Sequence, residues 1–490
     1  MSEPAFSSKS PPTGSFTTDP DTRSTTMTNT TTGPTYRVVN PANGKTMEEF
    51  EFASDAEIDQ ALTAVHTSFV SWKDVPITDR ADVLRRIATL FVERSDELAS
   101  FATEEMGKPF SKGKGEAEFC AQIFEYFATE GPDLAADQPI KTLSGGSAVV
   151  QKLPVGPLLG IMPWNYPFYQ VARFAAPNLM LGNTIILKHA ESVPRSALAI
   201  EKLMNDAGLP PGAYVNVFAT YAQIEQIIAD PRLQGVSLTG SERAGSVVAS
   251  IAGKNLKKCV LELGGSDPYI ILDSHDVDAA AALAWKKRMS NTGQACNSNK
   301  RIIVMDDIFE DFVSSITERA RGLTPGDPTK ETGGTFPPLS SRAAAELLDA
   351  QVRDAVDKGA TLHAGGKLAN DRSAYYSPAV LTGVTPEMRA YSEELFGPVA
   401  VIYKVSNDEE ALTLANDTSY GLGGAVFSSD VGRARALANR LEVGMSNVNH
   451  PASEGAEIPF GGVKRSGFGR ELGPLGMDEF VNKRLFYVAD

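Results

Sequence analysis

Strands and helices alternate through the middle of this chain, and this alternation restricts the possible folds more than any other feature of the sequence. Between residues 157 and 263, short apolar runs such as PLLGIM (157–162) and NTIILK (183–188) alternate with stretches of helical periodicity. Short apolar strands joined by helical crossovers predict a parallel sheet with helices on both faces. Such a sheet binds ligands beyond the carboxyl ends of its strands.

A second alternation follows the first and predicts a second α/β domain. Its expected strands cover residues 301–304, 399–405 and 423–428, with helices between them. Segment 138–154 is polar and alternating, and it fits neither domain. This segment is interpreted either as a projecting arm that pairs with another subunit or as an edge-strand loop.

The composition argues against several classes of function. A net charge of −15 disfavours a nucleic-acid partner. No apolar run reaches the roughly 18 residues that a membrane span needs, so no membrane partner is expected. The three cysteines cannot form a disulfide framework, which predicts a reducing compartment, the cytoplasm. No His or Cys cluster has the spacing of a zinc site, so no metal is expected.

The first 35 residues differ from the rest of the chain. They are rich in Ser and Thr, and they are interpreted as a disordered tail. A transit peptide would be rich in Arg and poor in acidic residues, which this segment is not. Whether translation starts at Met1 or at Met27 is left open.

Residues suited to a nucleotide follow several of the expected strands, although the G-x-G-x-x-G fingerprint is missing after all of them. Gly240 and Ser241 lie between a strand and a helix, where free N–H groups suit a pyrophosphate; a tight turn would use the same residues. Lys188 ends a strand and is interpreted as a ribose ligand or as a solvated charge. Glu191 follows it and can accept from ribose hydroxyls.

Three further residues point to chemistry at a carbonyl carbon. Asn165 stands between two aromatic residues in PWNYP and is either a rigid oxyanion donor or a turn asparagine. Glu262 ends an apolar strand before two glycines, as a general base with a raised pKa or as a salt-bridged residue. Cys296, in NTGQAC, follows a glycine turn that would expose its thiol as a nucleophile. Cys120 and Cys259 are expected to be packing residues.

These segments resemble the aldehyde dehydrogenase superfamily. The resemblance covers roughly residues 36–488 in consistent order. The motifs that carry it are PWNYP, ILKHAE, LTGSERAG, LELGGSDP, NTGQAC, EELFGPV and PFGGVKRSGFGRE. Within the superfamily, the chain is most similar to the NAD(P)-dependent succinate-semialdehyde dehydrogenase branch. The superfamily's sheet is a Rossmann variant without the glycine fingerprint, which agrees with its absence here.

The resemblance implies a Rossmann-like parallel-sheet cofactor domain, a second α/β catalytic domain and a small β oligomerisation arm. The expected divisions are the tail at 1–35, the NAD(P)-binding domain at 36–137 and 155–266, the arm at 138–154 and 475–490, and the catalytic domain at 267–474. The arm and the last strand would pair between subunits, which implies a homodimer or a homotetramer.

The resemblance also implies a role for each motif. Cys296 would attack the aldehyde, and Asn165 and the Cys296 backbone N–H would stabilise the oxyanion of the thiohemiacetal. Hydride transfer would leave a thioester. Water activated by Glu262 would hydrolyse it to the free acid, without coenzyme A. The implied cofactor ligands are Trp164, Lys188, Glu191, Gly240, Ser241, Glu394 and Phe396.

Arg173 is the expected substrate ligand. It lies eight residues after Asn165 and matches an arginine that pairs with the distal carboxylate in semialdehyde enzymes. We therefore expect its guanidinium near the mouth of the substrate channel, with a structural ion pair as the alternative. Ser290 stands where animal-type semialdehyde enzymes have a second arginine, and Ser298 where they can carry a second cysteine. These departures leave the exact aldehyde open.

The choice of cofactor follows from the charge near the ribose. Glu191 would repel a 2′-phosphate, which predicts a preference for NAD with NADP possible. His189 and Lys188 could soften that repulsion.

Other functions remain open at this point. One is an NAD(P)-dependent dehydrogenase of other small or medium aldehydes, with a structural Arg173. Another is a cysteine hydrolase or acyltransferase, which lacks a histidine partner for Cys296. A third is a non-catalytic scaffold, against which the intact Cys296, Glu262 and Asn165 argue.

Overall fold

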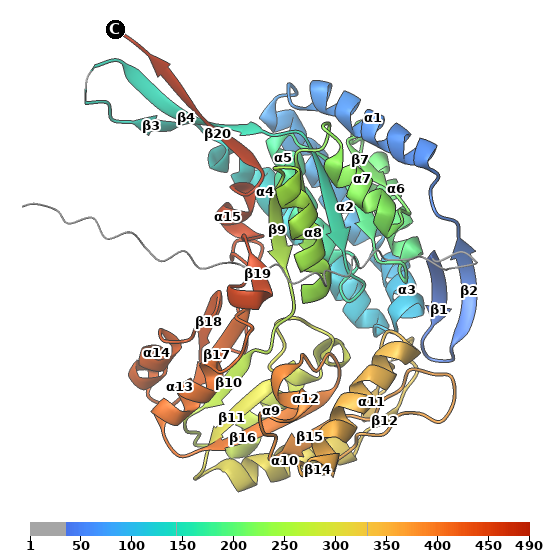
Figure 1. Ribbon diagram of the computed structural model, residues 1–490, viewed down its shortest axis with the longest axis vertical. Helices are drawn as coiled ribbons and strands as arrows, with labels where there is room; N and C mark the ends of the chain where they lie inside the picture. Colours follow the sequence, from blue (N-terminus) through green and yellow to red (C-terminus); the bar gives the residue numbers. More distant parts are fainter. Residues whose placement is uncertain (1–35, 144, 331) are drawn as a thin grey trace, which may run out of the picture. The chain divides into compact units, whose positions relative to one another are not determined.

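Parallel strands and helices form most of the chain in the computed structural model (Figure 1), which confirms the expected α/β class. The structure describes residues 36–143, 145–330 and 332–490. The tail predicted at 1–35, with Met27, lies outside them. Among the described residues, no helix combines the length and the apolar character needed to cross a membrane.

The first sheet has six strands in the order β19-β9-β8-β5-β6-β7. Five run parallel, as predicted: β5 (Pro157–Met162), β6 (Thr184–His189), β7 (Tyr214–Asn216), β8 (Gly235–Thr239) and β9 (Lys258–Glu262). The sixth, β19 (Gly467–Phe468), runs antiparallel to β9. A strand from the segment expected to form the catalytic domain therefore completes this sheet. A two-residue strand carries no periodicity, so it could not be predicted from the sequence.

Helices cover this sheet in two layers. Those that pack on the strands are α1 (Asp55–Trp72), α5 (Tyr169–Leu181), α6 (Pro194–Asp206), α7 (Tyr221–Ala229) and α8 (Glu242–Lys254). Two further helices, α2 (Ile77–Glu93) and α4 (Phe110–Leu134), pack on α5, and α3 (Ser95–Met106) packs on α4. The strands are apolar on both sides because both sides are covered.

The second sheet has seven strands in the order β14-β15-β16-β11-β10-β17-β18. They are β10 (Pro268–Ile271), β11 (Arg301–Met305), β14 (Thr361–Ala364), β15 (Ala379–Thr382), β16 (Val399–Val405), β17 (Gly423–Phe427) and β18 (Met445–Val448). Only the β14–β15 pair among them is antiparallel. The strands predicted at 301–304, 399–405 and 423–428 are confirmed.

Helices of this second region are α9 (Val277–Arg288), α10 (Phe309–Arg321), α11 (Arg342–Asp357), α12 (Arg389–Ser392), α13 (Asp408–Asn416) and α14 (Val431–Ala438). Shorter elements are β1 (Tyr36–Asn40), β2 (Lys45–Phe50), β12 (Thr324–Pro325), β13 (Thr335–Phe336), α15 (Gly473–Met477) and the 3-10 turns η1 (Ser290–Gly293) and η2 (Lys464–Ser466).

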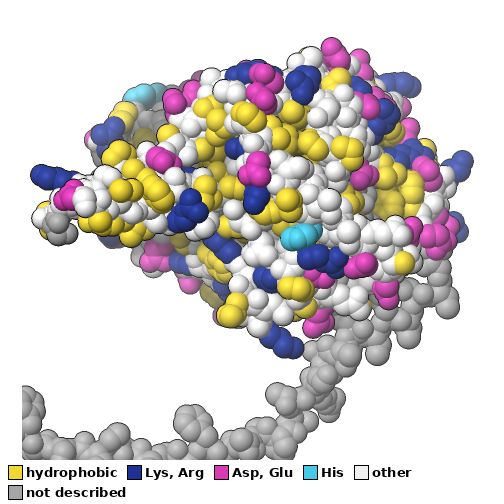
Figure 2. All heavy atoms as spheres, turned by 90° about the horizontal axis from the view of Figure 1, so that it is seen from above, with side chains coloured by type: hydrophobic (Ala, Val, Ile, Leu, Met, Phe, Trp, Pro, Cys, Tyr) yellow, Lys and Arg dark blue, Asp and Glu magenta, His cyan; other side chains and the backbone are white. Residues whose placement is uncertain are grey.

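A three-stranded sheet forms the arm that extends from the helices in Figure 1. It contains β3 (Gln138–Ile140), β4 (Ser147–Pro154) and β20 (Val481–Val488). Strand β20 pairs with β4 of the same chain along its whole length. Hydrophobic side chains gather on the projecting part (Figure 2), and among them Leu485 is 62% exposed and Phe486 50% exposed.

The carboxyl ends of the parallel strands in the first sheet carry the residues singled out in the sequence. Trp164 and Asn165 follow β5, and Lys188 lies near the end of β6. Ser241 follows β8 and caps α8, and β9 ends at Glu262. These side chains therefore meet at one edge of the sheet, where a parallel sheet binds its ligands.

Candidate active site

A pocket of about 240 Å³ is lined by Cys296. Its wall comes from α4, from the loop and helix that follow β5, and from the residues between α9 and β11. The aromatic rings of Tyr166, Tyr169 and Phe460 form much of this wall. The thiol predicted as a nucleophile is thus at a ligand-sized pocket, whereas Cys120 is buried in the core of the first region, as expected.

The backbone just before Cys296 is strained. Asn291, Thr292 and Gly293 have φ values of 48°, 56° and 73°. A left-handed conformation costs a non-glycine residue roughly 1 kcal/mol or more, so the surroundings must hold it in place. At Gly293, an added Cβ would lie 2.2 Å from the carbonyl oxygen of Gly397. The glycine turn expected from the sequence therefore requires glycine here for space as well as for conformation.

Arg288, at the end of α9, holds this loop and was not singled out in the sequence. Its guanidinium is fully buried and donates to the carbonyl oxygens of Gly293 at 3.2 Å, Leu395 at 2.8 Å and Gly397 at 2.6 Å. It also donates to the Ser298 hydroxyl at 3.0 Å. Burial lowers the pKa of Arg288 to about 9. One side chain thus fastens the NTGQAC loop to the EELFGPV segment.

Asn165 lies beside the same loop. Its Nδ2 donates to the backbone carbonyl oxygen of Gln294 at 3.1 Å, and its backbone carbonyl oxygen accepts from Nδ2 of Asn291 at 2.9 Å. The side chain is 4% exposed. Since the amide has a second N–H, Asn165 retains a donor beyond the one that Gln294 uses. The structure therefore brings together two of the residues predicted for catalysis.

Burial dominates the titration of Cys296. It raises the pKa of the thiol to about 11, while the positive charges of Arg173 and Lys300 lower that pKa. Only the thiolate is a strong nucleophile. Proton removal at Cys296 is therefore a step that the surrounding groups must assist.

Glu262 is 2% exposed, and neither of its carboxylate oxygens has a hydrogen-bond partner among the described residues. Burial raises the pKa of Glu262 well above its ordinary value, and the guanidinium of Arg173 opposes that rise. This agrees with the expectation of a buried carboxyl with a raised pKa and not with the salt-bridged alternative. The backbone of Glu262 is fixed from both sides, because it pairs with β19 on one side and with β8 on the other.

Arg173 does not occupy the position expected at the mouth of a substrate channel. Its side chain is fully buried, it forms an ion pair with Glu471, and its Nη2 donates to Oγ1 of Thr239 at 3.2 Å. The rings of Phe460 and Tyr169 lie over the guanidinium, at 4.5 Å and 5.2 Å from ring centroid to Cζ. The sequence spacing placed Arg173 on the correct helix, α5, but did not predict the direction of its side chain. The structural ion pair is what the structure shows.

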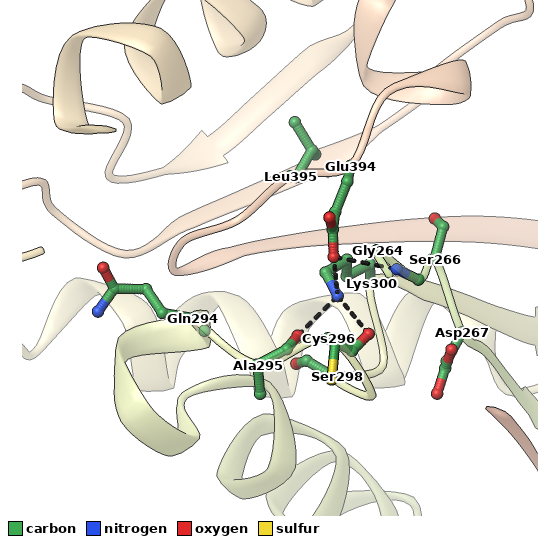
Figure 3. A network of polar contacts seen from close by, with 12 residues as sticks. Gly264, Ser266, Asp267, Gln294, Ala295, Cys296, Ser298, Lys300, Glu394 and Leu395 are labelled. Carbon is green, nitrogen blue, oxygen red and sulfur yellow. Dashed lines mark hydrogen bonds and ion pairs between the residues drawn. The ribbon is translucent and has the colours of Figure 1, made fainter. Parts of the chain in front are cut away.

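Lys300 joins the cysteine loop to Glu394, as Figure 3 shows. Its Nζ lies 2.9 Å from Oε1 of Glu394 and donates to the carbonyl oxygens of Ala295 at 2.7 Å and of Cys296 at 2.8 Å. The lysine side chain is 1% exposed and that of Glu394 is 19% exposed. Lys300 could not be singled out from the sequence, because it stands in a polar run that precedes a strand.

Lys188 and Glu191 lie together after β6. Nζ of Lys188 is 2.5 Å from Oε1 of Glu191, so the lysine offsets the charge of that carboxylate. His189 does not contribute a charge there. Burial lowers the pKa of His189 to about 4, and the imidazole is fully buried. Of the two groups expected to soften repulsion of a 2′-phosphate, only Lys188 is in a position to do so.

The remaining predicted ligands fit a dinucleotide. Ser241 is the N-cap of α8, and its hydroxyl accepts from the N–H of Ala244 at 3.3 Å. The first turn of a helix offers unpaired N–H groups to a pyrophosphate. The rings of Trp164 and Phe396 meet edge to face at 5.7 Å. The carboxyl edge of the first sheet is thus lined by an aromatic pair, by N–H groups of a helix start and by the acidic side chains of Glu191 and Glu394.

The pocket also has a charged side that the sequence did not reveal. Three lysines line it: Lys108, Lys112 and Lys287. Lys108 forms a buried ion pair with Glu116, and Lys287 lies 3.2 Å from Glu454. Within the ranges that the structure describes, no ion pair involves Lys112, which is exposed. With Glu116 and Glu454 as its two acidic residues, the lining of the pocket carries a net positive charge.

Comparison with known proteins places these features in a family. The profile of the aldehyde dehydrogenase family matches residues 27–485. The chain is 53% identical over 450 residues to a succinate-semialdehyde dehydrogenase [NADP(+)] of Deinococcus radiodurans, covering 92% of this chain and 94% of the relative. A Mycobacterium avium enzyme of the same name is 40% identical, with 92% and 96% covered.

A solved structure shows the same fold. The succinic semialdehyde dehydrogenase of Streptococcus pyogenes, in complex with NADP+, superposes with a TM-score of 0.89 at 39% identity. The match covers 93% of this chain and 100% of that one.

Proposed function

Since the chain belongs to the aldehyde dehydrogenase family, we propose that it oxidises succinate semialdehyde to succinate with NADP+ or NAD+. The observation that carries this proposal is the pocket, which is lined by Cys296 and by three lysines, while Asn165 bonds to the loop that carries Cys296. The acid product follows from Glu262, a buried carboxyl available to activate water.

The reaction begins at the thiol. Cys296 Sγ gives its proton to water and bonds to the aldehyde carbon, and the positive charges of Arg173 and Lys300 favour the thiolate. The oxyanion forms within reach of the second N–H of Asn165 and of the Cys296 backbone N–H. The bound nicotinamide supplies the hydride acceptor. Glu262 then takes a proton from water, which adds to the thioester carbon and releases the Cys296 thiolate.

Arg173 has a role at Glu262 in this proposal. A protonated carboxyl cannot accept a proton, and burial favours that form of Glu262. The guanidinium of Arg173 is the positive charge that most opposes this effect, and Glu471 fixes its position. Arg173 therefore acts on catalysis for every aldehyde, not on the choice of aldehyde.

Lys112 is the group that we propose for the far carboxylate of the substrate. Lys108 and Lys287 are already paired with Glu116 and Glu454, which leaves Lys112 to meet an incoming anion. An ammonium that donates to a carboxylate contributes a charge-assisted hydrogen bond.

The cofactor proposal rests on Lys188. The two relatives and the solved structure are named for NADP+ or contain it. Glu191 alone would repel a 2′-phosphate, but Lys188 pairs with it at 2.5 Å and reduces that repulsion. The proposed enzyme therefore accepts NADP+ as well as NAD+, and comparing kcat/KM for the two dinucleotides measures the preference.

The test is formation of NADPH or NADH from succinate semialdehyde, with Cys296→Ser as the inactive control. Succinate semialdehyde should have a higher kcat/KM than butanal, which has the same chain length without the carboxylate. A wild-type protein that forms no reduced cofactor contradicts the dehydrogenase proposal. A wild-type protein that prefers butanal would contradict the substrate proposal and would be a dehydrogenase of uncharged aldehydes.

Lys112→Met should raise KM for succinate semialdehyde about tenfold, since loss of a charge-assisted hydrogen bond costs roughly 1.5 kcal/mol or more. Kinetics with butanal should not change. Lys114→Met is the matched control, because Lys114 lies on the same helix, pairs with Asp96 and does not line the pocket. Equal losses on both aldehydes would show that Lys112 does not bind the carboxylate.

A further inference from the structure

The ammonium of Lys300 is fully committed to three acceptors. An ammonium has three N–H donors. Here they meet the carbonyl oxygens of Ala295 and Cys296 and Oε1 of Glu394, at 2.7 Å, 2.8 Å and 2.9 Å. The side chain is 1% exposed, so water cannot replace any of the three. A buried charge with this set of partners is held in one geometry.

The partners of Lys300 belong to two different parts of the proposed site. Cys296 carries the nucleophile, and its carbonyl oxygen is one acceptor. Glu394 follows α12 and, by its motif, faces the nicotinamide ribose. Its Oε1 is occupied twice, by Lys300 and by the N–H of Gly265 at 3.2 Å. This leaves Oε2 as the oxygen that can accept from a ligand hydroxyl.

Two glycines allow the approach. A Cβ on Gly264 would lie 2.5 Å from Oε2 of Glu394, and a Cβ on Gly265 would lie 2.6 Å from the carbonyl oxygen of Cys296. Gly264 and Gly265, which follow β9, therefore pack directly against the carboxylate of Glu394 and the backbone of Cys296. Figure 3 shows Lys300 between them.

We propose that Lys300 is a positioning residue that couples cofactor binding at Glu394 to the orientation and reactivity of Cys296. A hydroxyl that donates to Oε2 draws negative charge away from Oε1 and weakens its hold on the ammonium. The ammonium then interacts more strongly with the carbonyl oxygens of the cysteine loop. The proposal rests on the proposed function for the role of Glu394.

The test follows alkylation of Cys296 by iodoacetamide, read by mass spectrometry of its peptide, with and without NADP+. This readout needs no turnover. In the wild type, we expect NADP+ to change the alkylation rate at least about threefold. In Lys300→Met, the pH midpoint of alkylation should rise by about one unit, a tenfold loss of thiolate below the midpoint, and the response to NADP+ should disappear.

Two further variants make the result decisive. Lys404→Met is the matched control, since Lys404 lies 3.2 Å from Glu310 and over the Phe309 ring at 5.1 Å, but away from the pocket. Glu394→Gln keeps the bonds from Lys300 to the carbonyl oxygens, so it should fold and still lose the NADP+ response. If Lys300→Met is insoluble, Glu394→Gln decides the question at an NADP+ concentration that saturates this variant in a fluorescence titration, so that a lost response is not lost binding.

The outcomes separate this proposal from the proposed function. Lys300→Met or Glu394→Gln with a wild-type pH midpoint and NADP+ response would overturn the coupling, even in an active dehydrogenase. A wild type that alkylates with the predicted dependence on Lys300 but oxidises no aldehyde would overturn the function and leave the coupling standing.

Discussion

At the scale of single residues, His189 joins the end of β6 to the PWNYP loop. Its Nε2–H donates to the carbonyl oxygen of Pro167 at 2.9 Å, and its Nδ1 accepts from the N–H of Ala190 at 2.8 Å. These two bonds together require the neutral imidazole. Protonation would remove the acceptor and place a charge in a fully buried site.

Stability should therefore depend on pH through His189. Its pKa falls from 6.5 to about 4 on folding. The unfolded chain then binds a proton that the folded chain excludes, so this contribution to stability is full above about pH 6.5 and is lost as the pH falls toward 4. The loss is at most about 3 kcal/mol. Denaturant titrations from pH 7.5 to 4.5 measure it.

His189→Gln should flatten that profile, because the amide N–H can still reach Pro167 and no group there titrates. His66→Gln provides the control, since His66 is exposed on α1. An unchanged slope in His189→Gln would mean that other groups cause the acid sensitivity.

At this scale, the chemical type of the site residues could be predicted from the sequence, but the direction in which a side chain points could not. Cys296, Asn165 and Glu262 stand in motifs whose residue types are rare without a chemical reason, and all three are buried or at the pocket. Arg173 was assigned to the correct helix with the wrong side-chain direction. Lys300 and Arg288 could not be singled out, because Glu394 for Lys300, and the carbonyl oxygens of Leu395 and Gly397 for Arg288, lie far away in the sequence and leave no local pattern.

At the scale of elements, the strained turn η1 sets the position of Cys296, the proposed nucleophile. Gly293→Ala should reduce kcat at least about tenfold, because the new Cβ meets the Gly397 carbonyl oxygen and displaces the loop. Gly383→Ala separates the two causes. Gly383 has a φ of 72° but nothing within 4 Å of an added Cβ. It should lose some stability and keep its activity.

Steady-state kinetics and thermal melts of both variants check this prediction. Equal loss of activity in Gly293→Ala and Gly383→Ala would mean that backbone strain alone, and not the clash, disturbs the enzyme.

The parallel strands could be predicted because they are continuous apolar runs. The left-handed residues Asn291 and Thr292 could not, since only their tertiary contacts hold them.

At the scale of the whole molecule, the arm predicts assembly. Leu485 on β20 is 62% exposed and Phe486 is 50% exposed. Exposing such apolar side chains to water costs free energy unless another surface covers them. We expect a homodimer or homotetramer. Light scattering after size exclusion should show a multimer for the wild type, and a smaller species when Leu485 and Phe486 are both changed to Lys. A monomeric wild type would contradict the expected assembly.

Strand β19 has a consequence for how the chain is made. Its two residues close the edge of the first sheet beside Glu262, but they lie about 205 residues further along the chain than Glu262. During synthesis, that edge of the first sheet must therefore stay open until the whole second sheet region has been made. A product that ends before β19 would carry the cysteine loop without the finished surroundings of Glu262.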